Sequence, residues 1–299
     1  MSSINTNASA LTALQSLNAS NKALETTQSR ISTGFRVAEA SDNAAYWSIA
    51  TTMRSDNKAN SVVQDALGLG AGKVDTAYTG MKAAIGVVDQ IKEKVLMAKT
   101  ASTDDRAKIQ TEISSLQEQL KDSIGGATYA GSNLLKNAST DTTLSVMTSY
   151  NRDSAGAVTT GTINVNINNT RLIGTTAGAG ILDKAATGGT AILDIKVSGT
   201  GAATTGTGFD DLLTGIETAL KSMATGAAEL GAAKSRIDMQ KDFVSKMSDS
   251  IERGVGQLVD ADMNKESTRL QALQVQQQLG IQALSIANSN TQSILSLFR

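Results

Sequence analysis

The sequence predicts a mainly α fold, in which the N- and C-terminal flanks form a long antiparallel α-helical bundle or coiled-coil rod with a small β-rich central insertion. Apolar residues recur at 3–4 spacing through both flanks, as in heptad-patterned helices. Between about residues 138 and 208, Thr, Gly, Ala, Asn and Ser dominate, and apolar residues occupy alternate positions. Each flank therefore has an apolar stripe for which the other flank is the available partner.

The N-terminal flank predicts three helices in succession. The first begins in a stretch without charge, residues 1–21, and its large apolar residues are Ile4, Leu11, Leu14, Leu17, Leu24 and Ile31. The second carries a 4-3-4-3 pattern at Val74, Tyr78, Met81, Ile85 and Val88. After a break near Thr100, Thr103-Asp104-Asp105 fits an N-cap with an acidic first turn. The third helix then continues through Ile109, Ile113, Leu116 and Leu120.

The centre of the chain predicts strands in two places. Ile163, Val165 and Ile167 alternate with polar residues, and so do Leu193, Ile195 and Val197. Earlier, the segment 68–73 resembles a phosphate-binding loop, but it lacks two of the required residues and no strand signal precedes it. We interpret its glycines as a break or loosened turn between helices.

The C-terminal flank ends in a helix-length segment, 271–298, that contains no charged residue. Helical geometry divides its large apolar residues into two stripes on roughly opposite sides. One stripe comprises Leu273, Ile281, Leu284, Leu295 and Phe298. The other comprises Val275, Leu279, Ile286 and Leu297. A helix with two apolar faces needs two partners, and we expect one of them to be a second copy of the chain.

This pattern favours an assembly module over a catalytic one. We expect the polymerisation interface to comprise Leu11, Leu14, Leu17, Leu24, Ile31, Leu273, Val275, Leu279, Ile281, Leu284, Ile286, Ile294, Leu295, Leu297 and Phe298. Seven glutamines in the last segment argue against a membrane span, and a plain core helix is the alternative. Because ordering such a segment costs more than its own burial returns, we expect it to order only on docking.

Composition excludes several functional classes. The chain has no Cys, His or Pro, which rules out disulfides, a His/Cys zinc site and Ser-His or Cys-His catalysis. The balance of 27 basic and 28 acidic residues gives no reason to expect a nucleic-acid or membrane partner. Asp260, Asp262 and Glu266 fit a helix start better than a calcium loop. We expect no enzyme activity, metal or cofactor. The first positive side chain is Lys22, and without a basic region before it we expect no cleaved signal peptide.

Short motifs at both ends closely resemble the bacterial flagellins, most of all the alphaproteobacterial, rhizobium-like group. The N-terminal signature runs from residue 30 to 45 and includes Arg30, Ser32, Gly34, Arg36, Val37, Asp42, Ala44 and Ala45. The segments 259–262, 278–280 and 294–299 are similar to the flagellin C-terminus, and the Tyr46-Trp47 pair is similar to that of the rhizobium-like group. The motifs lie on both flanks of the chain.

The resemblance implies a structural subunit of the flagellar filament, which self-assembles into a helical tube for swimming. It implies an extracellular location after unfolded export through the flagellar type III apparatus. The implied partners are further copies, paralogous flagellins, the cap and junction proteins, and an export chaperone at the C-terminus. We expect three parts: inner-core terminal helices 1–40 plus 255–299, an outer helical rod 41–137 plus 209–254, and a small variable β-rich domain 138–208.

Two alternative functions remain beside that of a filament subunit. A hook-filament junction protein has related termini, and a secreted membrane-active amphipathic protein is the other alternative.

One surface of the chain departs from the family pattern. Around residues 89–94, many flagellins present an Arg-rich, Leu-containing surface to a vertebrate Toll-like innate receptor. This chain has Gln90, Lys92, Glu93 and Lys94 there, with Gln90 in place of an Arg and Lys94 in place of a Leu. We expect weak or absent recognition.

Overall fold

The computed structural model describes residues 7–153, 155–176, 178–184, 190–199, 201–203 and 205–296, with side chains through Ser289. The chain divides into two compact units. The terminal unit comprises residues 1–57 and 249–299, and the central unit comprises residues 58–248. Helices dominate both units, which confirms the mainly α prediction. Two of them, α2 (Ala44–Thr100) and α4 (Gly206–Val259), contribute to both units, and each unit is described by itself below.

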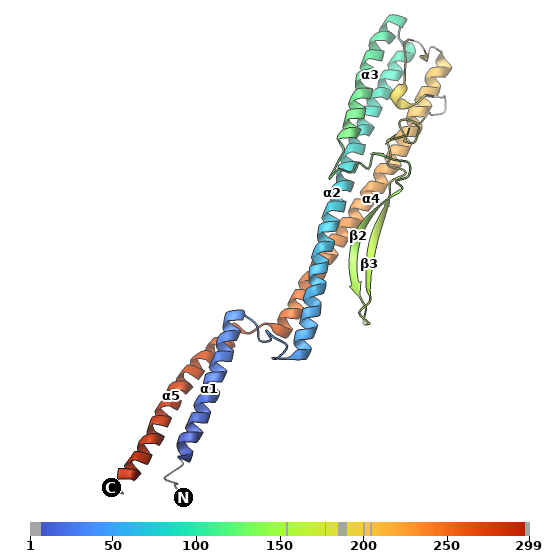
Figure 1. Ribbon diagram of the computed structural model, residues 1–299. Helices are drawn as coiled ribbons and strands as arrows, with labels where there is room; N and C mark the ends of the chain where they lie inside the picture. Colours follow the sequence, from blue (N-terminus) through green and yellow to red (C-terminus); the bar gives the residue numbers. More distant parts are fainter. Residues whose placement is uncertain are drawn as a thin grey trace. The chain divides into compact units, whose positions relative to one another are not determined.

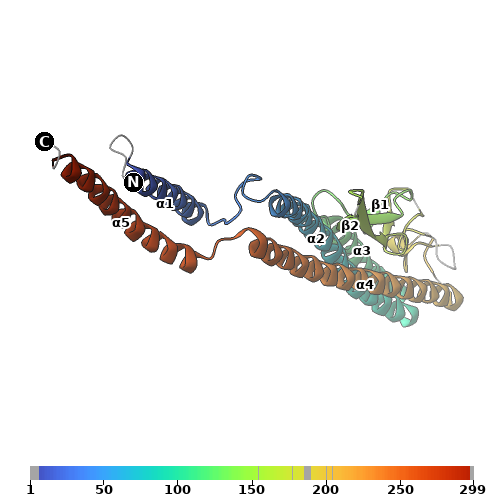
Figure 2. The same cartoon turned by 90° about the horizontal axis from the view of Figure 1, so that it is seen from below.

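In the terminal unit, α1 (Ala8–Thr33) and α5 (Met263–Ser296) lie side by side and run in opposite directions (Figure 1, Figure 2). The Asn7 side chain caps α1 by accepting from the Ala10 N–H at 3.0 Å. Gly34 ends the helix in the left-handed conformation, at φ 75°, which costs glycine little. The terminal segments therefore form paired helices, whereas we expected order only after docking. Burial of Leu273 between the two helices supplies part of the stabilisation that neither has alone.

The central unit is built on α2, α3 (Thr103–Gly126) and α4 around one apolar core. Ser102 caps α3 by accepting from the Asp105 N–H, one residue before the predicted N-cap. Ion pairs of Lys92 with Glu217 and of Lys99 with Asp210 join α2 to α4. Seventeen apolar residues of α2, α3 and α4 are fully enclosed, including Leu67, Met81 and Ile113. This unit holds most of the buried apolar surface.

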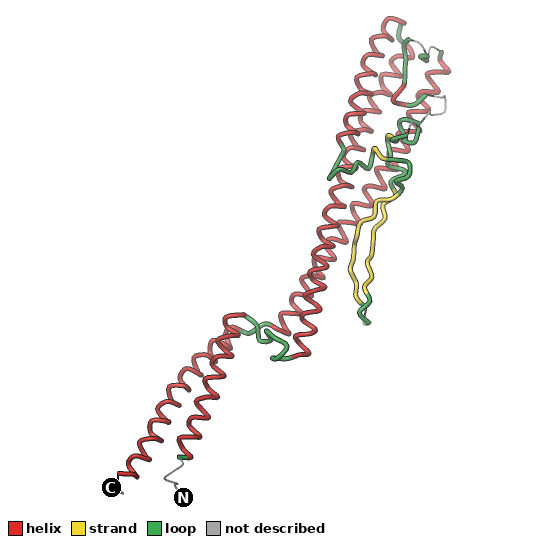
Figure 3. The backbone as a smooth tube through the Cα atoms, viewed as in Figure 1, coloured by secondary structure: helices red, strands yellow, loops and turns green. Residues whose placement is uncertain are grey.

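Two small sheets complete the central unit. The strands β2 (Thr143–Arg152) and β3 (Val158–Asn166) form an antiparallel hairpin, drawn in yellow in Figure 3. Two-residue strands β1 (Lys136–Asn137) and β4 (Ile173–Gly174) pair in parallel. The alternation at Ile163 and Val165 correctly predicted β3. The strand predicted through Leu193, Ile195 and Val197 is wrong, because this segment contains a 3-10 turn, η1 (Ile192–Asp194).

The break predicted at the glycines near residue 70 is also wrong. The helix α2 continues through Gly68, Gly70 and Gly72 without interruption. A Cβ at Gly70 would lie 2.6 Å from Val146 Cγ1 of the hairpin, and one at Gly72 would lie 2.6 Å from Tyr129 Cζ. These glycines permit close packing against the helix.

Candidate polymerisation surface

The helix α5 has one face against α1 and another facing solvent. On the inner face, Leu273 is buried and Leu284 is half-buried. On the outer face, Val275 is 57% exposed, Leu279 59% and Ile286 63%. We call these last three residues the outer stripe. Large apolar side chains that are more than half exposed at helical spacing form a surface prepared for another partner.

One residue of the predicted stripes was assigned to the wrong face, and several others lie outside the described residues. Ile281 was assigned to the stripe of Leu273, but it is 54% exposed. It lies about 80° around the helix from Leu273, which places it on the flank of the pair. Leu297 and Phe298 lie outside the described residues, as do the side chains of Ile294 and Leu295.

The predicted interface residues of α1 divide in the same way. Leu17, Leu24 and Ile31 are half-buried, whereas Leu11 is 57% and Leu14 45% exposed. The fully buried positions of α1 are Ser20 and Thr27, so the seam with α5 contains small polar side chains. Opposite Leu17, a Cβ at Gly280 would lie 3.2 Å from Leu17 Cδ1. The two helices therefore approach closely but bury little apolar area.

Three polar contacts fix the register of α1 and α5. The Arg30 guanidinium pairs with the Glu266 carboxylate at 3.4 Å, near one end of the seam. Gln277 Nε2 donates to Asn21 Oδ1 at 2.8 Å in the middle. Asn7 donates its side-chain amide to the Ala287 carbonyl at 3.0 Å near the other end. The apolar pattern gave no signal for these contacts, although polar residues on a helical seam commonly specify register.

The family-signature residues form the joint between α1 and α2. The N–H groups of Arg36 and Val37 donate to the Val259 carbonyl at 2.6 and 3.2 Å, and Ala261 N–H donates to the Gly34 carbonyl at 2.9 Å. The Arg36 guanidinium also donates to the Leu258 carbonyl at 2.9 Å. This places a cation at the C-terminal end of α4, whose last turn has no basic residue of its own.

The remaining signature residues hold a turn between α1 and α2 or lie on the surface. The Asp42 carboxylate accepts from the Ala38 and Glu39 N–H groups at 2.9 and 3.2 Å. Ala44 and Ala45 are the first residues of α2 and are exposed, as is Ser32. At the start of α5, hydrogen bonds from backbone N–H groups, chiefly that of Lys265, hold the pKa of Asp262 below its usual value. The acidic group predicted to start a helix therefore does so.

The four residues of the predicted receptor surface lie on α2 in the central unit. Gln90 and Glu93 are exposed. Lys92 pairs with Glu217 of α4, and this hydrogen bond raises the pKa of Lys92. Lys94 pairs with Glu112 of α3 at 2.5 Å. Both cations of this surface are therefore engaged within the subunit.

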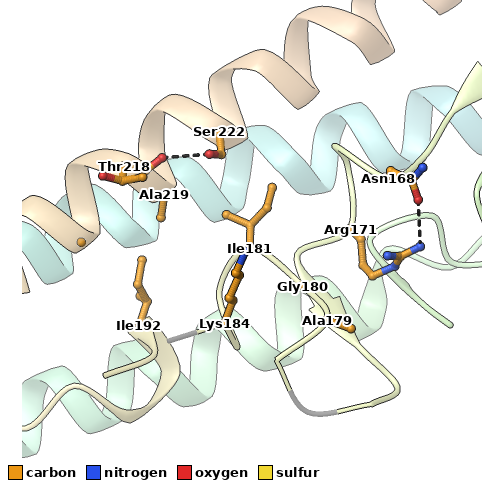
Figure 4. A pocket seen from close by; sticks show the side chains of 11 residues that line it. Asn168, Arg171, Ala179, Gly180, Ile181, Lys184, Ile192, Thr218, Ala219 and Ser222 are labelled. Atoms are coloured by element: carbon orange, nitrogen blue, oxygen red, sulfur yellow. Dashed lines mark hydrogen bonds between the residues drawn. The ribbon is translucent and has the colours of Figure 1, made fainter. Parts of the chain in front are cut away.

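A pocket of about 390 Å³ lies in the central unit between α4 and the residues Asn168, Arg171, Ala179, Gly180, Ile181, Lys184 and Ile192 (Figure 4). The hydroxyls on its helical wall donate to their own helix, Thr218 to the Thr214 carbonyl and Ser222 to the Thr218 carbonyl. Arg171, which is buried, donates to Asn137 Oδ1 and to the Asp141 carbonyl. These lining groups are therefore already hydrogen-bonded within α4 or to the segment 137–141.

Comparison with known proteins identifies the family. The bacterial flagellin N-terminal helical region matches residues 4–140, and the C-terminal helical region matches residues 213–298. The chain belongs to the bacterial flagellins. It is 57% identical to the flagellin of Brucella melitensis biotype 1, and 47% identical to flagellin C and 43% identical to flagellin A of Rhizobium meliloti strain 1021. Each alignment covers 100% of both chains.

Family membership at this identity makes the chain a structural subunit of the flagellar filament. Flagellins are a structural protein family, and Rhizobium meliloti strain 1021 has several of them. The crystal structure of Bacillus cereus flagellin is a remote match, with a TM-score of 0.40 and 16% identity over 61% of this chain and 88% of that one. Across the described part of this flagellin, no helix has the length and apolarity that a membrane crossing requires.

Proposed function

We propose that the terminal unit of this flagellin polymerises through the outer stripe of α5 and the exposed leucines of α1. The observation that carries the proposal is the exposure of Val275, Leu279 and Ile286, each above half, on a helix whose opposite face already has a partner. Leu297 continues the outer stripe along the sequence, and Ile294, Leu295 and Phe298 belong to the same predicted polymerisation interface. Neighbouring subunits cover the stripe and stabilise the α1–α5 pair at the same time.

Electron microscopy of the purified full-length chain tests this mechanism. Filament fragments are added as seeds, and the chain is compared with a version that lacks residues 271–299. We expect long tubes from the full-length chain and none from the shortened one. Tubes from both would place the driving contacts elsewhere. Relatives named as flagellins along their whole length favour the micrometre-long tube over the short ring of a junction protein.

The terminal helices also bear on how the chain is exported and which proteins bind it on the way. We propose that the chain leaves the cell unfolded through the flagellar type III apparatus, without a cleaved signal peptide, and assembles beneath a cap protein onto a junction. An export chaperone covers the outer stripe before secretion, because these apolar side chains are otherwise in water. The prediction is loss of the chain from culture medium when the export apparatus is inactivated. The proposed division into 1–40 plus 255–299, 41–137 plus 209–254, and 138–208 describes its parts in the filament.

We further propose that the vertebrate Toll-like receptor recognises this flagellin weakly. Lys92 and Lys94 are held by Glu217 and Glu112, so a receptor must compete with these ion pairs. Gln90 offers no charge for a buried pair at the interface. Purified monomer should give a much weaker reporter-cell signal than a flagellin with Arg and Leu at these positions. Full-strength signalling would contradict the proposal, and the double substitution Gln90→Arg with Lys94→Leu should increase the signal.

A further inference from the structure

The pocket beside α4 contains a buried cation that no acidic side chain neutralises. Arg171 lines this pocket and is only 5% exposed. Its guanidinium donates from Nε to Asn137 Oδ1 at 2.5 Å, and from Nη2 to the Asp141 carbonyl at 2.7 Å and to Asn168 Oδ1 at 3.5 Å. All three acceptors are uncharged. No carboxylate of the described residues pairs with Arg171, and the undescribed residues between 154 and 204 include no Asp or Glu.

One nitrogen of this guanidinium is available to a ligand. Nη1 makes no hydrogen bond to a described residue, whereas Nε and Nη2 are both engaged. Nor is Nη1 sealed from solvent, because the sealed side-chain atoms without a partner in the described part of the chain are Asn60 Oδ1, Glu229 Oε2 and Glu266 Oε2. A buried charge is costly unless an opposite charge compensates it. The guanidinium therefore favours an anion in the pocket that it lines.

Lys184 adds a second positive charge to the same pocket. Its side chain is exposed and makes no ion pair with a described residue. None of the described residues that line the pocket is acidic. Two cations without an anion are a local excess in a chain that has 27 basic and 28 acidic residues. A concave surface lined by charges of one sign attracts ligands of the other sign.

The wall of the pocket on α4 offers acceptors for hydrogen bonds. Figure 4 shows Thr218 and Ser222 on this helix, across from the segments that carry Arg171 and Lys184. Each hydroxyl donates its hydrogen to the helix carbonyl four residues before it, so its oxygen can still accept. The apolar side chains of the lining are Ala179, Ile181, Ile192 and Ala219. The volume of about 390 Å³ is that of an ordinary small-molecule site.

We propose that this pocket binds a sugar acid, a small molecule that carries a carboxylate, several hydroxyls and an apolar ring face. The carboxylate pairs with Arg171 Nη1 and the Lys184 ammonium. Hydroxyls of the sugar donate to the oxygens of Thr218 and Ser222, and the ring packs on the apolar lining. Every residue of the site belongs to the central unit, so binding does not depend on polymerisation.

Isothermal titration calorimetry of the full-length monomer with glucuronate tests the site. We expect one saturable site, and binding of glucose and of inorganic phosphate that is about tenfold weaker or more, because glucose lacks the charge and phosphate lacks the sugar hydroxyls. Absence of saturable glucuronate binding, or equal binding of glucose or phosphate, would overturn the proposal. A trimer of galacturonate that binds as tightly as glucuronate supports an acidic polysaccharide as the source of the ligand. A trimer that binds much more weakly supports the free sugar acid.

Substitutions assign the binding to this pocket. Lys184→Glu should weaken glucuronate binding about tenfold or more, because it reverses a charge beside the carboxylate. Ser222→Ala should weaken it about three- to tenfold, through loss of one hydrogen bond, and leave phosphate binding unchanged. Lys196→Glu, at an exposed position outside the pocket, is the matched control and should bind like wild type. Lys184 and Lys196 are both exposed, so neither substitution should alter the circular dichroism of the monomer. Wild-type affinity in Lys184→Glu, or an equal loss in Lys196→Glu, would overturn the site.

Discussion

Replacing Val275, Leu279 and Ile286 together by alanine should prevent filament growth at ordinary concentrations and leave the free subunit nearly unchanged. The three side chains are 57, 59 and 63% exposed, so roughly three-fifths of their burial is still to be gained on docking. Full burial of such a side chain contributes about 1.5–3 kcal/mol, and alanine keeps part of that, so the triple variant forfeits about 2–4 kcal/mol per subunit. This corresponds to a rise of about 30- to 1000-fold in critical concentration.

Sedimentation of seeded protein over a range of monomer concentrations measures the effect. The matched control replaces Gln274, Gln278 and Ser285, exposed residues on a polar side of the same helix, by alanine. The control should polymerise close to the wild-type concentration, and both monomers should melt close to wild type, since exposed substitutions rarely change stability by more than about 0.5 kcal/mol. A triple variant that polymerises like wild type would refute the assignment of the outer stripe. If the control variant failed to polymerise to the same extent, the effect would not be specific to the outer stripe.

Three further substitutions test the joint and the helix pair. Leu284→Asp places a charge on the inner face of α5, so hydrogen exchange should show faster opening of α1 and α5 with the central unit unaffected. Arg36→Gln removes the donation to the Leu258 carbonyl and should lower the free energy of local opening at the joint, measured by hydrogen exchange, by about 0.5–1 kcal/mol, because this hydrogen bond is exposed to water. Because the pKa of Asp262 is lowered from 3.8, its stabilisation is present above that pH and lost on further acidification, whereas Asp262→Asn caps α5 without titrating. Helicity followed between pH 2 and 6 should therefore fall less steeply in this variant.

Heptad spacing predicted the helices because burial of a seam requires it, but it did not predict where backbone groups find partners. Leu193, Ile195 and Val197 alternate like a strand and are buried like one. Their backbone instead pairs with glutamine side chains of α3. Gln117 Nε2 donates to the Ile192 and Ile195 carbonyls at 2.9 and 3.3 Å, and Val197 N–H donates to Gln110 Oε1 at 2.6 Å. A periodic pattern reports which side chains are covered and contains no information on which group satisfies the backbone.

The candidate site shows the same limit. Apolar spacing alone separated Leu273 and Leu284 from the outer stripe, and the structure has that division. It misplaced Ile281, which is apolar and lies between the two faces. It also gave no sign of the contact between Arg30 and Glu266, since two charged residues 236 positions apart have no local signature. Long-range polar partners become visible only when the register of the two helices is known.

The different cores of the two units explain how one chain can be both a folded subunit and a polymer. The central unit encloses a continuous set of apolar side chains from α2, α3, α4 and both sheets, so its stability does not depend on neighbours. In the terminal unit, the buried apolar residues are few and the α1–α5 seam contains Ser20, Thr27 and Glu266. Its folding free energy must therefore be small until the outer stripe is covered. A weakly stabilised pair opens readily, as the proposed threading through an export channel requires, and becomes stable where a neighbouring subunit supplies the missing contacts.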